Sequence, residues 1–192
     1  MTYDPDKHHR RSIRLRGYDY ALAGAYFVSI VTQDRACLLG EVVEGVILND
    51  AGQMVQAVWD ELPVFYPNVD IDEIVVMPNH IHGIIILVGA APRGRPDIGS
   101  NGLQDSGQAR GPAPTTMSLG DVVHRFKTMT TKRYADGVKQ SGWATFRGRL
   151  WQRNYYEHII RDEPALNRIR RYIDENPLQW AFDAENPHRA TS

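Results

Sequence analysis

The sequence has one cysteine, no long hydrophobic run and almost no net charge. With Cys37 alone, no disulfide can form within the chain, which fits a reducing cytoplasm. No run of eighteen apolar residues is present, so we expect no membrane span, and residues 1–7 lack the apolar stretch of a signal peptide. The apolar content of 42% is enough for the core of one domain. We therefore expect a cytoplasmic protein without a membrane partner.

A net charge of −1 does not by itself indicate a nucleic-acid-binding protein, but the basic residues are clustered. A local basic face can bind phosphates even where the whole chain is neutral. The alternative, a solvated surface, stays open for each cluster. The candidates for nucleic-acid contacts are Arg10, Arg11, Arg14 and Arg16 in a basic arm (1–19), Lys127 and Lys132 in one predicted helix, and Arg149 and Arg153 before the last helix.

Apolar patterning predicts an α/β (α+β) domain. Helices are expected from Asn49 or Asp50 to Pro63, from Ser118 to Gly137 and, last, from Pro164 to Pro177. Strands are expected at 26–32, 42–48 (an edge strand or hairpin arm), 69–76, 80–88 and 150–160. Without 42–48 the order is βαββαβ, which predicts a ferredoxin-like antiparallel sheet with helices packed on it, plus an extra C-terminal helix. Residues 89–116, rich in Gly, Pro and Ser, are expected to form a mobile linker.

Two histidines begin the strand expected at 80–88. His80 and His82 flank Ile81, and residues two apart on a strand point to the same face of a sheet. The two imidazoles should therefore lie side by side, where they could bind one divalent ion, while Ile81 points into the core. A bare His-x-His pair is more often structural than metal-binding, so this pair alone does not decide its role.

The last predicted helix carries Tyr172 and Asn176 on the face that should pack on the sheet, together with Ile169 and Ile173. A tyrosine hydroxyl, with its ordinary pKa of about 10, is a weak nucleophile that needs activation. The amide oxygen of Asn176 is a suitable third ligand for Mg²⁺ or Mn²⁺ beside two imidazoles. Such an ion could orient a phosphodiester for attack, so the pattern favours phosphoryl-transfer chemistry.

Three motifs, taken in order, resemble a known family. They are His-Ile-His at 80–82, Trp-Gln-x-x-Tyr-Tyr-Glu-His at 151–158 and Tyr-Ile-x-x-Asn-Pro at 172–177. Over about residues 20–180 this set is similar to that of the REP-associated tyrosine transposases, a branch of the single-tyrosine HUH transposases.

The resemblance implies a role for each matching residue. His80 and His82 would bind a divalent metal, Mg or Mn, with Asn176 as the third ligand. Better-known relatives have glutamine at that third position. Tyr172 would attack single-stranded DNA and become linked to its 5′ phosphate, leaving a 3′ hydroxyl.

The resemblance also implies organisation and partners. Residues 20–182 would form an HUH transposase-like catalytic domain, with a tail at 183–192. Its substrate would be single-stranded or hairpin DNA, which places the protein at the nucleoid. Other single-tyrosine enzymes act as dimers with shared sites, whereas this branch resembles monomers, and a monomer is favoured here.

Two other functions stay open at this point. A non-catalytic relative would bind a DNA or RNA hairpin without forming an adduct. A metal-dependent nuclease would use water as its nucleophile. Tyr155 and Tyr156 are rival nucleophiles, and His158 is left without a role.

Overall fold

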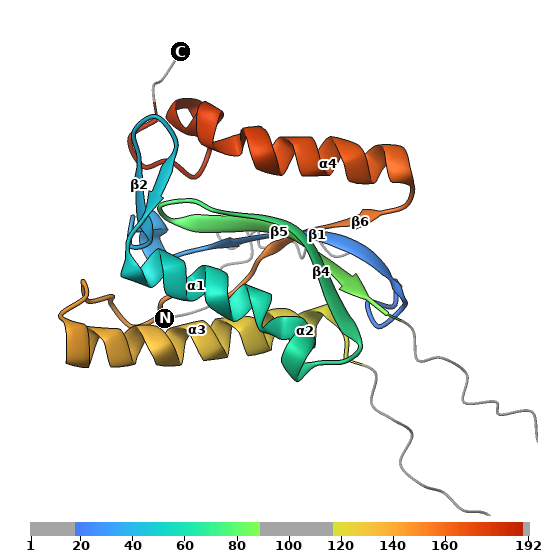
Figure 1. Ribbon diagram of the computed structural model, residues 1–192, viewed down its shortest axis with the longest axis horizontal. Coiled ribbons are helices and arrows are strands. Elements are labelled where there is room, and N and C mark those ends of the chain that lie inside the picture. Colours follow the sequence, from blue (N-terminus) through green and yellow to red (C-terminus); the bar gives the residue numbers. More distant parts are fainter. Residues whose placement is uncertain (1–17, 89–116, 190–192) are drawn as a thin grey trace, which may run out of the picture.

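A four-stranded antiparallel sheet, in the order β4-β5-β1-β6, lies at the centre of the molecule (Figure 1). The computed structural model describes residues 18–88 and 117–189. Its strands are β1 (Gly24–Val31), β4 (Val69–Val76), β5 (His80–Leu87) and β6 (Tyr156–Ile160). A separate hairpin pairs β2 (Gly40–Val42) with β3 (Val46–Leu48), so the apolar stretch 42–48 is a hairpin rather than part of the main sheet.

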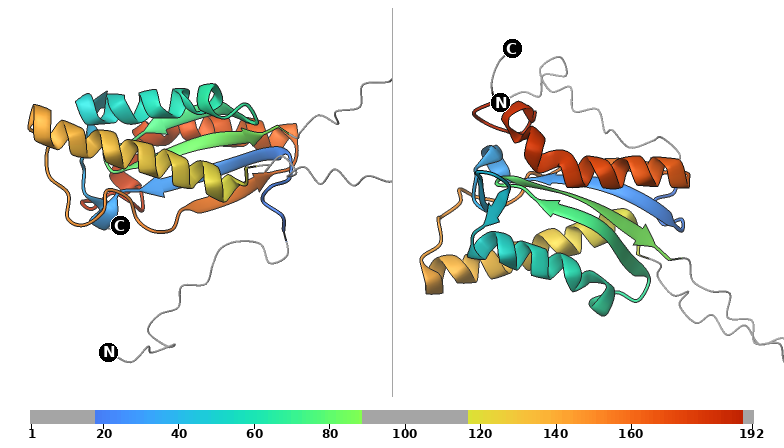
Figure 2. Two further views of the ribbon diagram at one scale, coloured as in Figure 1. Left: turned by 90° about the horizontal axis from the view of Figure 1, so that it is seen from below. Right: turned by 45° about the horizontal axis from the view of Figure 1, so that its top comes forward.

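Helices cover both faces of this sheet. On one face lie α1 (Asp50–Asp60), the short α2 (Leu62–Phe65) and α3 (Leu119–Ser141), with α1 and α3 side by side in Figure 2. On the other face lies α4 (Glu163–Glu175), which continues as the 3₁₀ helix η2 (Asn176–Phe182). When the β2–β3 hairpin is left out, the order of elements is βαββαβ followed by α4. The ferredoxin-like antiparallel plan with an extra C-terminal helix is therefore confirmed.

Strand alternation divides the core into two clusters. Val28, Ile30 and Ile81 pack under α1 and α3, while Phe27 and Ile84, from the opposite face of the same strands, pack under α4. None of the helices in the described ranges is long and apolar enough to cross a membrane.

The strand expected at 150–160 is wrong over its first half. Only Tyr156–Ile160 form β6, and before it Trp151 makes an isolated bridge to Thr32. The carbonyls of residues 152–154 accept hydrogen bonds from Lys127 Nζ at 2.9, 3.4 and 3.0 Å. Because these three carbonyls bind one ammonium group, they cannot accept hydrogen bonds from a neighbouring strand. The aromatic composition of this segment favours a strand, but its hydrogen bonds are used elsewhere.

Three helix ends also differ from expectation. Pro63 does not stop α1, which ends at Asp60; instead it occupies the first turn of α2, where its missing N–H is harmless. The third helix passes Gly137 and ends at Gly142, whose φ of 68° suits the left-handed cap. Pro177 ends α4 but not the helical path, because Asn176 keeps α geometry and η2 follows. The predicted linker 89–116 and most of the basic arm lie outside the described residues.

Candidate active site

The two histidines lie together on the α4 face of β5. His80 is fully buried and His82 is 5% exposed, and their ring centroids are 4.5 Å apart. Ile81 between them packs in the opposite core cluster. In the register of the sheet, His82 lies directly opposite Ser29 of β1. Strand alternation thus places both imidazoles on one surface, as the sequence predicts.

An N-cap, an ion pair and an apolar contact fix the position of α4 above this surface. The helix begins at its N-cap Asp162, whose carboxylate accepts from the Ala165 N–H at 2.7 Å. Arg170 then binds both carboxylate oxygens of Asp72, at 2.9 and 2.5 Å, where a register shift interrupts β4. Ile173 packs in the apolar cluster beneath the helix. These contacts tether the helix on either side of residue 172.

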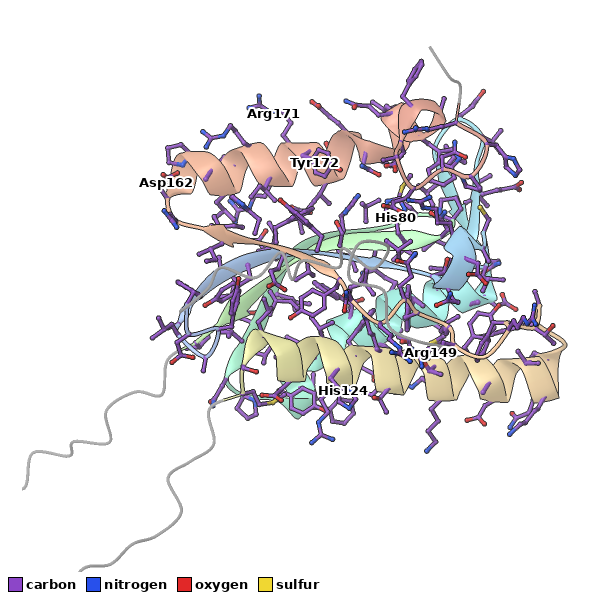
Figure 3. The ribbon with its side chains drawn as sticks, turned by 180° about the vertical axis from the view of Figure 1, so that it is seen from behind. His80, His124, Arg149, Asp162, Arg171 and Tyr172 are labelled. Atoms are coloured by element: carbon purple, nitrogen blue, oxygen red, sulfur yellow. The ribbon has the colours of Figure 1, made fainter. Side chains whose placement is uncertain are left out.

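Tyr172 brings its hydroxyl to 3.4 Å from His82 Nε2. Figure 3 shows Tyr172 on α4 and His80 on the same side of the sheet, with Arg171 pointing away from it. Phe27 fills the space below, with its ring centroid 5.4 Å from that of His82 and 5.9 Å from that of Tyr172. The predicted nucleophile and the histidine pair therefore meet within one chain.

Hydrogen bonds to Nδ1 orient both imidazoles. Asn79, fully buried, donates from Nδ2 to the carbonyls of Arg35 and Glu185 at 3.0 and 2.7 Å. Its Oδ1 can only accept, so it accepts from Nδ1–H of His80 at 2.8 Å. The Nε2 atom of the neutral His80 ring is then unprotonated and has a free lone pair. Ser29 Oγ lies 2.5 Å from Nδ1 of His82 and leaves that Nε2 facing Tyr172.

The residues fit a bound cation. His80 Nε2 and Asn176 Oδ1 are buried and have no hydrogen-bond partner among the described residues. Such orphaned acceptors are costly unless something binds them. Ligand atoms of His80, His82 and Asp183 lie within 4.8 Å of one another, a grouping that could hold one ion. Asp183, which follows η2, is the residue that sequence reasoning missed, because it lies in the expected tail and shares no spacing with the other three.

Burial sets the charge state of the site. It lowers the pKa of His82 from 6.5 to about 3, with the neighbouring His80 adding to the effect. Burial also lowers the pKa of His80, against the opposing charges of Asp183 and Glu185 and the nearby Asn176 amide. The pKa of Tyr172 is raised, first by burial and then by Asp183. Near neutral pH the site thus holds two neutral imidazoles and a protonated phenol.

A pocket of about 500 Å³ opens over these groups, lined among others by His82, Tyr172, Asn176 and Asp183. Gln152 lines this pocket and also a groove of about 880 Å³. The groove is lined by four arginines, Arg35, Arg147, Arg149 and Arg153. The arginine-lined groove and the pocket therefore adjoin at Gln152.

The other predicted DNA-binding residues are placed differently. Lys127 is bound to three carbonyls and so supports the loop that carries Arg153. Lys132 is exposed on α3, across the sheet from the pocket. The predicted contacts Arg10, Arg11, Arg14 and Arg16 lie outside the described residues.

The remaining aromatic and histidine candidates make no hydrogen bond to the histidine pair that the described residues show. Tyr156 lies opposite Ser29 in β6 and lines the pocket. Tyr155 also lines the pocket but packs on the other core cluster, with Lys127 Nζ 5.5 Å from its ring centroid. His158 is exposed on the edge strand and lies outside the pocket.

Comparison with known proteins adds a family and a fold. No family model matches the chain. An uncharacterised protein of Haemophilus influenzae strain Rd is 39% identical over 185 residues, which are 94% of this chain and 95% of that protein. The chain belongs to the same family as this protein. Its fold is similar to that of a REP-associated tyrosine transposase solved with a REP hairpin, with a TM-score of 0.52 and 20% identity, over 88% of this chain and 74% of that one.

Proposed function

We propose that the protein is a metal-dependent DNA strand transferase that cleaves and rejoins single-stranded, hairpin-associated DNA through Tyr172. The observation that carries the proposal is the hydroxyl of Tyr172 at 3.4 Å from His82 Nε2, beside a second imidazole whose Nε2 is a buried, unpartnered acceptor. The similarity in fold to a transposase bound to a REP hairpin supports a DNA hairpin as the partner.

His80, His82 and Asn176 would hold the divalent cation, Mg²⁺ or Mn²⁺. When bound, the cation would neutralise charge on the scissile phosphate and favour ionisation of the phenol, whose pKa burial raises. Ser29 and Asn79 keep both Nε2 atoms turned toward the site. A hydrogen bond at each Nδ1 is the kind of outer contact that orients ligating histidines in metalloproteins.

The reaction itself is a transesterification. The hydroxyl oxygen of Tyr172 forms a bond to phosphorus while the bond from phosphorus to the 3′ oxygen of the preceding nucleotide breaks. Water in the open pocket takes the phenolic proton, and the leaving oxygen gains one to become a 3′ hydroxyl. Because the product is still a phosphodiester, a 3′ hydroxyl can later attack it and release Tyr172 without an external energy source.

The basic groove supplies a path for the strand. Arg149 and Arg153 line it and form no ion pair within the described ranges, so their guanidinium groups are free for phosphates. Lys132 and the four arginines of the basic arm remain proposed contacts to the hairpin stem. We propose a monomer because Tyr172 reaches histidines of its own chain, and a location at the nucleoid because the substrate is DNA.

A denaturing gel tests the proposal. Oligonucleotides with one hairpin and a randomised single-stranded flank, labelled at the 3′ end, are incubated with the protein and Mn²⁺. The 3′ fragment should migrate covalently bound to the wild-type protein. Tyr172→Phe and EDTA should abolish this band, while Tyr156→Phe should retain it. An adduct on the Tyr172→Phe protein would reject the nucleophile.

The same gel separates the alternatives. Cleavage without a protein-linked band indicates a nuclease that uses water. Hairpin binding in a gel-shift assay, without cleavage under any divalent ion, indicates a binding protein. Either result would overturn the proposed strand transfer.

A further inference from the structure

Three hydrogen-bond acceptors of this site lack a donor. Nε2 of His80 and Oδ1 of Asn176 are buried without a hydrogen-bond partner among the described residues, and a carboxylate oxygen of Asp183 lies within 4.8 Å of the ligand atoms of both histidines. We propose that Asp183 is a ligand of the divalent cation, so that the segment after η2 completes the metal site. This inference rests on the metal site of the proposed function and adds to it a residue outside the histidine and tyrosine motifs.

His80 Nε2 and Asp183 Oδ2 are both hydrogen-bond acceptors and cannot satisfy each other. Because Nδ1–H of His80 donates to Asn79 Oδ1, Nε2 of the neutral His80 ring carries no proton and can only accept. Asp183 Oδ2 lies 3.8 Å from that nitrogen, beyond hydrogen-bonding distance, and an ionised carboxylate also only accepts. Two lone pairs facing each other in a buried site repel, and a cation between them turns the repulsion into binding.

Protonation of His80 would not by itself join the two groups, because 3.8 Å is too long for a hydrogen bond even from an imidazolium. The second oxygen of Asp183 is already engaged, because Oδ1 accepts from the Glu185 N–H at 2.6 Å. Only Oδ2 faces His80.

Contacts to Glu185, two residues along the chain from Asp183, hold this segment in place. Asn79 Nδ2 donates to the Glu185 carbonyl, and Arg35 Nε donates to the Glu185 carboxylate at 2.7 Å. Arg35 and its neighbour Asp34 have φ values of 55° and 58°, left-handed conformations that non-glycine residues adopt at a cost. A strained turn is thus used to fix the segment that follows Asp183. Asn79 connects this segment to the histidine that it orients.

The chemistry of the set points to a hard divalent ion. A carboxylate and an amide oxygen, added to two imidazoles, favour Mn²⁺ or Mg²⁺ over ions that prefer sulfur. The carboxylate also brings the one negative charge among the donors. Its loss should therefore weaken metal binding more than the loss of a neutral donor would.

Calorimetric titration of the full chain with Mn²⁺, without DNA, tests this role. Asp183→Asn should weaken binding at least about tenfold, whereas Asp174→Asn, an exposed carboxylate on the same helical unit, should leave it unchanged. The asparagine can still accept from the Glu185 N–H, so the turn should persist. In EDTA the Asp183→Asn protein should melt no lower than wild type, because its amide can donate to the orphaned acceptors. Equal Mn²⁺ affinity in Asp183→Asn and wild type would overturn the inference.

A direct spectroscopic test does not depend on affinity. In a Cys37→Ser background, Asp183→Cys with Co²⁺ should show a thiolate-to-cobalt charge-transfer band, and Asp174→Cys should show none. No band in the Asp183→Cys protein would reject coordination by this position. If wild type fails to bind Mn²⁺, the proposed metal site falls with it. If wild type binds but residue 183 has no effect, only the role of Asp183 is lost.

Discussion

Gly83→Ala tests the packing that holds the histidine strand in place. A Cβ at this position would lie 2.6 Å from Cζ2 and 2.7 Å from Cη2 of Trp59, which is fully buried. Ordinary carbon–carbon contacts are about 3.5 Å or longer. The strand or the indole must therefore move by about 1 Å, in a core where Trp59 already packs edge-on against Phe126 with ring centroids 5.6 Å apart.

The expected cost follows from two opposing terms. Overpacking of a buried site destabilises by about 1–3 kcal/mol. Replacing glycine by alanine stabilises by about 0.4–1 kcal/mol through the entropy of the unfolded chain. Gly83→Ala should therefore lower the free energy of unfolding by about 1 kcal/mol, and by no more than about 2.6 kcal/mol. Gly45→Ala is the matched control, because no atom lies within 4 Å of the point that its Cβ would occupy and only the entropic term applies.

Urea unfolding followed by far-ultraviolet circular dichroism gives both values. The double variant Trp59→Phe/Gly83→Ala should be less destabilised than the sum of its single changes, because a smaller ring leaves room for the methyl group. Gly45→Ala should raise the free energy of unfolding slightly. If Gly83→Ala does not lower it relative to Gly45→Ala, the packing argument is refuted. Strict additivity with Trp59→Phe would show that the strain lies elsewhere.

Three further predictions concern the supports of the site. Arg170→Met removes the pair with the largely buried Asp72 and should lower the free energy of unfolding and reduce adduct yield; unchanged values would show that the pair does not position α4. Lys127→Met should cost about 1–3 kcal/mol and speed proteolysis within 150–155, which limited digestion would detect. Because the pKa of His82 is about 3 when folded and 6.5 when unfolded, the unfolded chain binds the extra proton and stability falls as pH drops below 6.5. At pH 4.5, two units below 6.5, this loss is about 2.7 kcal/mol relative to neutral pH, and urea titrations in EDTA should show it removed by His82→Gln.

Features set by short-range periodicity could be predicted from the sequence. The pleat of β5 alone places His80 and His82 on one face, and the turn of α4 alone places Tyr172 and Asn176, four residues apart, on the face that lines the pocket. Apolar spacing gave the order of strands and helices, and this order gave the ferredoxin-like sheet. Each of these steps needs only residues within one element and one rule of geometry.

Features set by contacts between distant segments could not be predicted in this way. Residues 150–155 have the composition of a strand, but Lys127 on α3 binds their carbonyls and Trp151 Nε1 donates to Thr130. Gly137 looks like a helix end, yet α3 continues to Ser141, and Trp143, which lies just past the helix, packs on the space that Gly137 leaves open. In the first case a residue far along the chain, and in the second a residue just beyond the helix, outweighs local propensity.

Asp183 could not be placed from the sequence, because its position depends on Asn176 adopting α geometry before a proline, which a residue in that position normally avoids. A residue before proline normally avoids α geometry, and a break at Asn176 would send the chain away from the sheet. Asn176 instead has φ −58° and ψ −40°, and the chain turns through η2 back to the histidines. The same residue keeps its Oδ1 buried without a partner, a cost that the fold bears in the absence of a ligand. An unfavourable backbone step and an unsatisfied acceptor at one residue fit the metal-binding role proposed for Asn176 better than a purely structural one.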